Sequence, residues 1–173
     1  AHPNIKESQA NKALVDAVSD MEGVAVFNLY ELSQEIAFNV DEWSKIISDA
    51  SAVIYQFPFY WMSAPSLLKK WQDEVFTFLS KTPAVAGKSL TVVTTTGSEY
   101  EAYRSGGRNR FTMDELLRPY QVSAIHSGMS WQTPIVVYGM GTADAGKNIA
   151  EGANLYKQRV EMLIGSSNAG NNW

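Results

Sequence analysis

Residues 52–75 read AVIYQFPFYWMSAPSLLKKWQDEV, and this stretch decides the fold. It opens with an apolar run, Ala52 to Gln56, which is rich in β-branched residues and predicts a buried strand. A short turn with four aromatic residues and two prolines follows. A helix comes next, with Ser63 as its predicted cap and Pro65 in its first turn. The inward stripe of this helix is formed by Leu67, Leu68, Trp71 and Val75.

The rest of the chain repeats this alternation of apolar runs and helical stretches. The other predicted strands are Val24 to Tyr30, Ser89 to Thr95 and Pro134 to Tyr138. Three helical segments are marked by a shared apolar face around Val40 to Ile47, by the capping-box spacing of Thr112 and Glu115 before Pro119, and by apolar spacings of three and four from Ile149 to Leu163. The pattern predicts an α/β fold, in which a parallel sheet carries helices on both faces.

The beginning of the sequence predicts a strand that lies upstream of it. Ser8 to Met21 forms a predicted helix, and in a doubly wound sheet a helix in this position follows an interior strand. Only Ala1, His2 and Pro3 precede the loop, so we expect a truncated first strand and an apolar segment before Ala1. We expect one domain over residues 1–165. The tail at 166–173, with little to bury, is expected to be disordered.

Composition excludes several classes of function. The formal charge of -4 argues against nucleic-acid binding, which needs a concentrated basic face. With no cysteine and two histidines, metal catalysis is disfavoured and we expect no metal ligands. No apolar run approaches the ~20 residues of a membrane helix, and no signal segment opens the chain, so a cytoplasmic protein is expected.

Three loops are candidates for a binding site, because ligands of open α/β sheets bind beyond the carboxyl ends of the strands. The loop from His2 to Asn11 leads into a helix N-terminus that favours a phosphate, although a capped helix start has the same pattern. The turn after Gln56 offers a rigid aromatic platform for a flat ligand, or rings that fold back onto the core. The loop Thr94 to Ser98 offers donors to a ring edge, or is an ordinary turn.

Taken together, these motifs resemble one family. The order AHPN, QFPFYWMSAPSLLKKW, TTTGS, GG, DELLRP and VVYGM is similar to the NAD(P)H:quinone oxidoreductases of flavodoxin-like fold. This family includes quinone reductases, modulators of drug activity and ancillary reductases of glutathione-gated potassium efflux systems. The resemblance covers Ala1 to about Leu163, and Gln56 to Asp73 is its most specific part. It implies a flavodoxin-like, doubly wound, five-stranded parallel sheet.

The resemblance also implies a flavin cofactor, FMN in preference to FAD, and assigns its contacts. The phosphate would lie near His2, Ser8, Ala10 and Asn11. The ring would lie along Pro58, Phe59, Tyr60, Trp61 and Met62. Its polar edge would face Thr95, Thr96 and Gly97. Tyr103 falls where the family places a catalytic tyrosine, and Asn109 lies where a partner histidine is often found, so the proton relay is open; Arg108 and Arg110 are candidates for binding the dinucleotide phosphates.

The function implied is two-electron, ping-pong hydride transfer from NADH or NADPH to a quinone-like acceptor, with the active sites at the interface of a homodimer. Exposed aromatics such as Tyr100 and Phe111 would suit that interface. The alternative is a flavin-bearing ancillary subunit that binds a potassium-efflux transporter at the membrane. The sequence separates these two functions poorly.

Overall fold

The computed structural model describes residues 1–32 and 37–169 of the chain. Its sheet has four parallel strands: β1 (Ala52–Pro58), β2 (Ser89–Thr95), β3 (Ser130–Trp131) and β4 (Ile135–Val137). The central strand is β2, which pairs with β1 along its whole length on one side. On the other side it pairs first with β3 and then with β4. The described sheet therefore has four strands rather than the predicted five.

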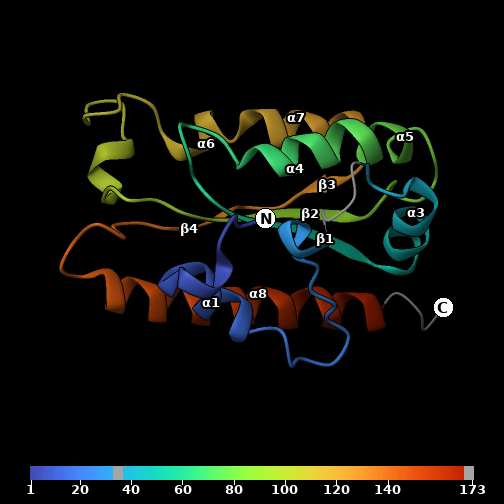
Figure 1. The fold of residues 1–173 in the computed structure, drawn as a ribbon, viewed down its shortest axis with the longest axis horizontal. Helices are drawn as coiled ribbons and strands as arrows, with labels where there is room; N and C mark the ends of the chain where they lie inside the picture. The colour runs from blue at the N-terminus through green and yellow to red at the C-terminus, as the bar shows by residue number, and fades with distance from the viewer. Residues whose placement is uncertain (33–36, 170–173) are drawn as a thin grey trace.

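Two helical layers cover the sheet (Figure 1). One layer contains α4, α5, α6 and α7, and the other contains α1 and α8. The bounds of the α-helices are α1 Gln9–Asp16, α2 Leu29–Leu32, α3 Val40–Asp49, α4 Ser66–Trp71, α5 Thr77–Leu79, α6 Met113–Leu116, α7 Arg118–His126 and α8 Ala145–Ala169. Two short 3-10 turns, η1 (Ile5–Glu7) and η3 (Tyr100–Tyr103), and a π-helical turn, η2 (Gln72–Phe76), complete the order.

Each face of the sheet has its own apolar core. Alternate residues of a strand point to opposite faces, so Tyr55 and Phe57 pack under α4 and α7, whereas Ile54 packs toward α1 and α8. The second core is smaller and is centred on Leu14, Val18, Val93, Ile135, Tyr156 and Val160. Both faces of the sheet are thus buried, as the continuous apolar strand sequences predict.

Most predicted elements are confirmed, but one predicted strand and several boundaries are wrong. The predicted strand Val24 to Tyr30 is irregular up to Asn28 and then becomes α2, because no described strand lies beside it to accept its hydrogen bonds. Ser63 does not cap α4. Its backbone forms a bridge with Tyr60, and Pro65 is the residue before the helix.

Two further boundaries differ later in the chain. Pro119 stands in the first turn of α7, just after α6, so it opens a second helix as well as ending the first. The last helix continues past the expected boundary at residue 165 and ends at Ala169. None of the described helices combines the length and the apolar character that crossing a membrane needs.

The outer edge of β1 borders a groove of about 670 Å³, which we call the β1 groove. Its walls include Val26, Phe27, Trp43, Val53 and Val160. The amino group of Ala1 donates a hydrogen bond of 2.7 Å to the carbonyl of Gln56 at the carboxyl end of this edge. Backbone groups alternate in direction along a strand, so the amides and carbonyls of Ala52 and Ile54 point to the same outer side as those of Gln56. No described residue outside the sheet pairs with them.

Candidate flavin site

Three strands end level with one another, and their loops form the candidate site. Pro58 of β1 lies opposite Thr95 of β2, and Thr95 lies opposite Val137 of β4. The loops that follow are residues 59–65, 96–99 and 138–142. All three leave the carboxyl edge of the parallel sheet, where α/β proteins bind their ligands.

The loop after β1 is a strained aromatic turn. Tyr60 and Ser63 exchange two backbone hydrogen bonds, of 2.8 and 3.0 Å. Between them Trp61 and Met62 have φ angles of 46° and 60°, as in a type I′ turn, which glycine and asparagine normally supply. The left-handed conformation costs about 1–2 kcal/mol for each such residue. The turn leaves the Trp61 side chain 97% exposed, so this ring does not fold back onto the core.

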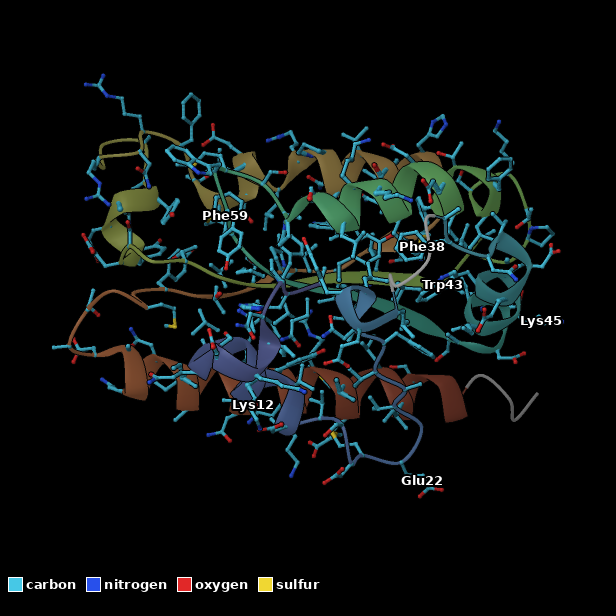
Figure 2. The ribbon with its side chains drawn as sticks, in the orientation of Figure 1. Lys12, Glu22, Phe38, Trp43, Lys45 and Phe59 are labelled. Atoms are coloured by element: carbon cyan, nitrogen blue, oxygen red, sulfur yellow. The ribbon has the colours of Figure 1, made fainter. Side chains whose placement is uncertain are left out.

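The remaining ring contacts of this turn anchor it to the site. Pro58 is buried at the end of β1, and the amide of Phe59 donates to the carbonyl of Thr95 at 2.9 Å. Phe59 lies over the carboxyl end of the sheet in Figure 2, with its ring 6.2 Å from that of Tyr103. Tyr60 and Met62 are about half exposed. The predicted platform therefore has a buried base and an exposed rim.

The N-terminal loop is joined to the same site through Asn11. This side chain is 2% exposed, and its amide donates to the Thr95 hydroxyl at 3.1 Å. Gln56 supports Asn11 by donating to its carbonyl at 2.9 Å. His2 reaches the aromatic turn, with its ring 6.5 Å from that of Tyr60. The structure thus brings together the predicted phosphate loop, the aromatic turn and the loop Thr94 to Ser98, which we call the Thr loop.

The start of α1 retains free donors. The Ser8 hydroxyl accepts a hydrogen bond from the Asn11 amide, and the Lys12 amide donates to the Ser8 carbonyl. The amides of Gln9 and Ala10, the first two of the helix, have no described partner. Unpaired amides at a helix N-terminus are suited to an anion such as phosphate. Ser8 therefore caps the helix, and the amides left for a ligand are those of Gln9 and Ala10.

The loop after β2 offers backbone donors rather than hydroxyls. The Thr95 hydroxyl is bonded to Asn11, and the Thr96 hydroxyl donates to the Ser98 carbonyl at 2.8 Å. The amides of Gly97 and Ser98 have no described partner. A Cβ added at Gly97 would meet nothing within 4 Å, so the space beside it is open. These two amides could serve the polar edge of a flat ring.

The third loop at this edge of the sheet, Tyr138 to Thr142, is not among the candidate loops predicted from the sequence. Its backbone packs against the Thr loop, because the amides of Gly139, Met140 and Gly141 donate to the carbonyls of residues 96–98 at 2.8–2.9 Å. Gly139 has a φ of 77°, and a Cβ at Gly141 would lie 3.1 Å from the Gly97 carbonyl oxygen. The signal was available, since this loop also follows a predicted strand and contains two glycines.

Tyr103 and Asn109 lie in the segment that follows the Thr loop, but they differ in their surroundings. The Tyr103 side chain is buried, and its ring packs against Phe59 and, at 5.9 Å, against Tyr138. Asn109 is half-buried, and its backbone amide donates to the Ala102 carbonyl at 2.9 Å. The Asn109 side chain forms no hydrogen bond with any described residue. Tyr103 is therefore set between the platform and the third loop.

Burial shifts the pKa values of three groups near the site in the direction that favours their uncharged forms. The pKa of the Ala1 amine is lowered to about 6 by burial. The pKa of His2 is lowered mainly by burial and secondly by that amine, and its Nδ1 accepts a hydrogen bond from the Asn4 amide. Burial raises the pKa of Tyr138 to about 12, helped by the nearby Asp114 carboxylate. Tyr138 is thus a neutral phenol at neutral pH.

Fold and site together define an α/β protein of the flavodoxin-like class, and the family model for the flavodoxin-like fold matches residues 1–160. The chain belongs to this family, in the branch of NAD(P)H:quinone oxidoreductases that the sequence motifs resemble. It is therefore an oxidoreductase-family protein.

Two relatives illustrate this branch. An NAD(P)H oxidoreductase of uncharacterised role, YdeQ of Bacillus subtilis, is 36% identical over 94% of this chain and 84% of its own. The glutathione-regulated potassium-efflux system ancillary protein KefG of Pectobacterium atrosepticum is 34% identical over 80% of this chain and 78% of its own.

Two solved structures share the fold. General stress protein 14 of Treponema denticola, solved in complex with FMN, has a TM-score of 0.85 and 28% identity, and it aligns over 94% of this chain and 95% of its own. An NADPH-quinone reductase of P. pentosaceus has a TM-score of 0.77 and 27% identity over 91% and 92% of the two chains.

Proposed function

We propose that this protein binds FMN between the start of α1 and the loops at the carboxyl edge of the sheet, and transfers two electrons from NAD(P)H to a quinone-like acceptor, the two substrates using the site in turn. One observation carries the proposal. Trp61 is held almost fully exposed in a costly backbone conformation, on a turn that is hydrogen-bonded to the end of β2. Strain of this kind persists at ligand sites, where it serves binding. The FMN complex of the Treponema denticola relative supports this choice of cofactor over FAD.

The residues of the site fit such a cofactor. The free amides of Gln9 and Ala10 would hold the phosphate, with His2, Ser8 and Asn11 shaping the loop. The ring would rest on the turn from Pro58 to Met62, and the amides of Gly97 and Ser98 would meet its polar edge. Thr95 and Thr96 act indirectly, since their hydroxyls fix the loop. A bound flavin would supply the two-electron chemistry, taking hydride from nicotinamide and passing it to the acceptor.

The side chains would then position substrates and donate hydrogen bonds. Stacking on an exposed aromatic ring orients a flat substrate, and orientation is the larger part of catalysis in hydride transfer. The Tyr103 hydroxyl is our candidate to hydrogen-bond the acceptor as negative charge develops on it. Asn109 is assigned a supporting place in the same loop, because a neutral amide does not shuttle protons near neutral pH.

The visible spectrum of the purified protein tests this function. We expect flavin absorption bands, or uptake of FMN on titration, and bleaching of those bands on anaerobic addition of NADH or NADPH. Subsequent addition of a quinone should restore them. A protein that binds neither FMN nor FAD would refute the proposal.

We also propose a homodimer. Tyr100, Leu155 and Met162 are about half exposed or more, and with Tyr103 they line a hollow of about 570 Å³ near the outer edge of β4. Apolar groups gathered around a hollow near the site are typical of an interface. Sedimentation velocity should give a mass of two chains, and Met162→Glu should shift it toward one.

A second candidate is a flavin-bearing ancillary subunit of a potassium-efflux transporter, favoured by the identity with KefG. In that case the protein would be cytoplasmic and bind the transporter at the membrane surface. Co-purification of the two proteins from detergent-solubilised membranes would support this role. A protein that reduces quinones but never co-purifies with a transporter would favour the free enzyme.

A further inference from the structure

Three arginines lie close together in the sequence, in the segment that follows the Thr loop. Arg104, Arg108 and Arg110 are all exposed, and none forms an ion pair with a carboxylate within the described part of the chain. Their other contacts differ. Arg104 lies over the Tyr100 ring, 5.3 Å from its centre, and Arg108 donates to the Ser98 hydroxyl at 2.5 Å. The loop therefore presents three guanidinium groups that have no carboxylate within ion-pair distance among the described residues.

The backbone of this loop is fixed. Two successive turns are closed by hydrogen bonds from the Gly107 amide to the Arg104 carbonyl, at 2.8 Å, and from the Arg110 amide to the Gly107 carbonyl, at 3.0 Å. A Cβ on Gly107 would lie 2.0 Å from the Glu101 carbonyl oxygen, so only glycine fits this close approach. The bond from Asn109 to Ala102 ties the loop to η3. The position of Arg108 is consequently set by the fold.

The contact with Ser98 places the Arg108 guanidinium next to the Thr loop. The Ser98 carbonyl accepts hydrogen bonds from the Thr96 hydroxyl and the Gly139 amide, so this residue is held from two sides. Its own amide is one of the two free donors of the Thr loop. A guanidinium bonded to the Ser98 hydroxyl thus places a full positive charge within a few bonds of those donors. Arg110, two residues along, has no described side-chain contact with this loop.

We propose that Arg108 is the residue that sets the reduction potential of the bound flavin, by holding a positive charge at the polar edge of its ring. This rests on the function proposed above. A nearby cation favours the more negative, reduced form of the cofactor, because opposite charges attract over several ångströms. The Ser98 hydroxyl holds the guanidinium in this position, so Ser98 contributes to the effect on the potential.

The test measures the two-electron midpoint potential of FMN-loaded protein against reference dyes, for the wild type and for single variants. Arg108→Gln should lower the potential by about 30 mV, which is a tenfold change for a two-electron couple. Arg110→Gln removes the same charge from the same loop and should leave the potential nearly unchanged. Arg108→Lys should restore part of the loss. Ser98→Ala should give part of the effect, and combined with Arg108→Gln it should add little.

A second readout does not involve turnover. Sulfite adds to oxidised flavin and brings negative charge to the ring, so Arg108→Gln should weaken sulfite binding about tenfold and Arg110→Gln should not. Equal potentials for the wild type and Arg108→Gln, or equal losses in the two arginine variants, would overturn the inference.

Two other results would distinguish an effect on the reduction potential from dinucleotide binding and from a failure of the proposed function. If Arg108→Gln raises only the Michaelis constant for NADPH while the potential and sulfite affinity stay unchanged, Arg108 binds the dinucleotide and the inference is wrong. If the wild-type protein binds no flavin at all, the proposed function itself fails and this inference with it. A wild type that binds FMN, is reduced by NADH or NADPH and is reoxidised by a quinone keeps the proposed function, whatever the arginine variants do.

Discussion

The β1 groove and the carboxyl-edge site flank the same strand, yet they are built in opposite ways. In the site, polar groups from four segments are cross-linked by hydrogen bonds between Asn11 and Thr95, Phe59 and Thr95, and Gly139 and Ser98. Along the groove, apolar side chains face open space, and the backbone of Ala52 and Ile54 has no described partner outside the sheet. In Figure 2, Phe59 of the site and Trp43 of the groove lie toward opposite ends of the sheet.

This difference teaches what each region requires. The site has a scaffold that is already held together by hydrogen bonds. The groove has the opposite need, because an unpaired strand edge lined by apolar residues is suited to another extended segment. Changes in the groove should therefore alter stability, whereas changes in the site should alter binding and turnover.

The largest effect is expected from filling the groove. A chain engineered with six β-branched residues joined in front of Ala1 should be more stable by several kcal/mol, since each fully buried Val or Ile contributes roughly 1.5–3 kcal/mol. The extension would run parallel to β1 and continue from the Ala1 to Gln56 contact. Urea denaturation gives the free energy of unfolding. A six-residue Gly/Ser extension is the control, and equal stability of the two chains would contradict the prediction.

The next effect is the pH dependence of folding in a chain that begins at Ala1. The pKa of this amine falls from 8.0 to about 6 on folding, so between pH 6 and 8 the unfolded chain binds more protons than the folded one. Stability should therefore rise by up to roughly 2 kcal/mol from pH 6 to pH 8, and be lost as the pH falls. The extended chain has no ammonium at this position and should lose most of this dependence.

The site should respond in turnover to Tyr103→Phe. Loss of one hydrogen bond to the acceptor should slow reoxidation by quinone tenfold to a hundredfold, while reduction by NAD(P)H changes less. Rapid-mixing absorbance measurements separate the two half-reactions. Asn109→Ala is the comparison variant and should have little effect. An unchanged Tyr103→Phe enzyme together with an inactive Asn109→Ala enzyme would reverse the roles assigned to these residues.

The smallest effect is expected from Trp61→Ala. Ring contact is worth on the order of 1 kcal/mol, so the dissociation constant of FMN should rise roughly fivefold, as measured by fluorescence titration. Folding stability should hardly change, because this side chain is almost fully exposed. Trp61→Gly also relaxes the left-handed backbone and should be more stable than Trp61→Ala, although it binds FMN no better. A large loss of stability in Trp61→Ala would show that the ring supports the core.

Much of the fold could be predicted because its signals are local. The apolar runs at 52–56, 89–95 and 134–138 are strands, and Thr112 with Glu115 forms the predicted capping box. The prediction of a strand from Val24 to Tyr30 is wrong, because apolar content in a sequence does not supply a neighbouring strand to pair with. The prediction of Ser63 as a helix cap is wrong, because the backbone of Ser63 is hydrogen-bonded to Tyr60 and closes the turn before the helix.

For the candidate site, the sequence by itself pointed to the loop from His2 to Asn11, the turn after Gln56 and the loop Thr94 to Ser98, and to the residue types they offer, since the rule that ligands bind beyond the carboxyl ends of strands needs only the order of the elements. It did not point to the loop Tyr138 to Thr142. Only the tertiary structure decided how those residues are used. It assigned the Thr95 and Thr96 hydroxyls to internal hydrogen bonds, left the amides of Gly97 and Ser98 free, and set Arg108 rather than Arg110 on Ser98. The physical reason is that hydrogen-bond partners distant in sequence meet only after the sheet has formed, so no local pattern can record which donors remain free.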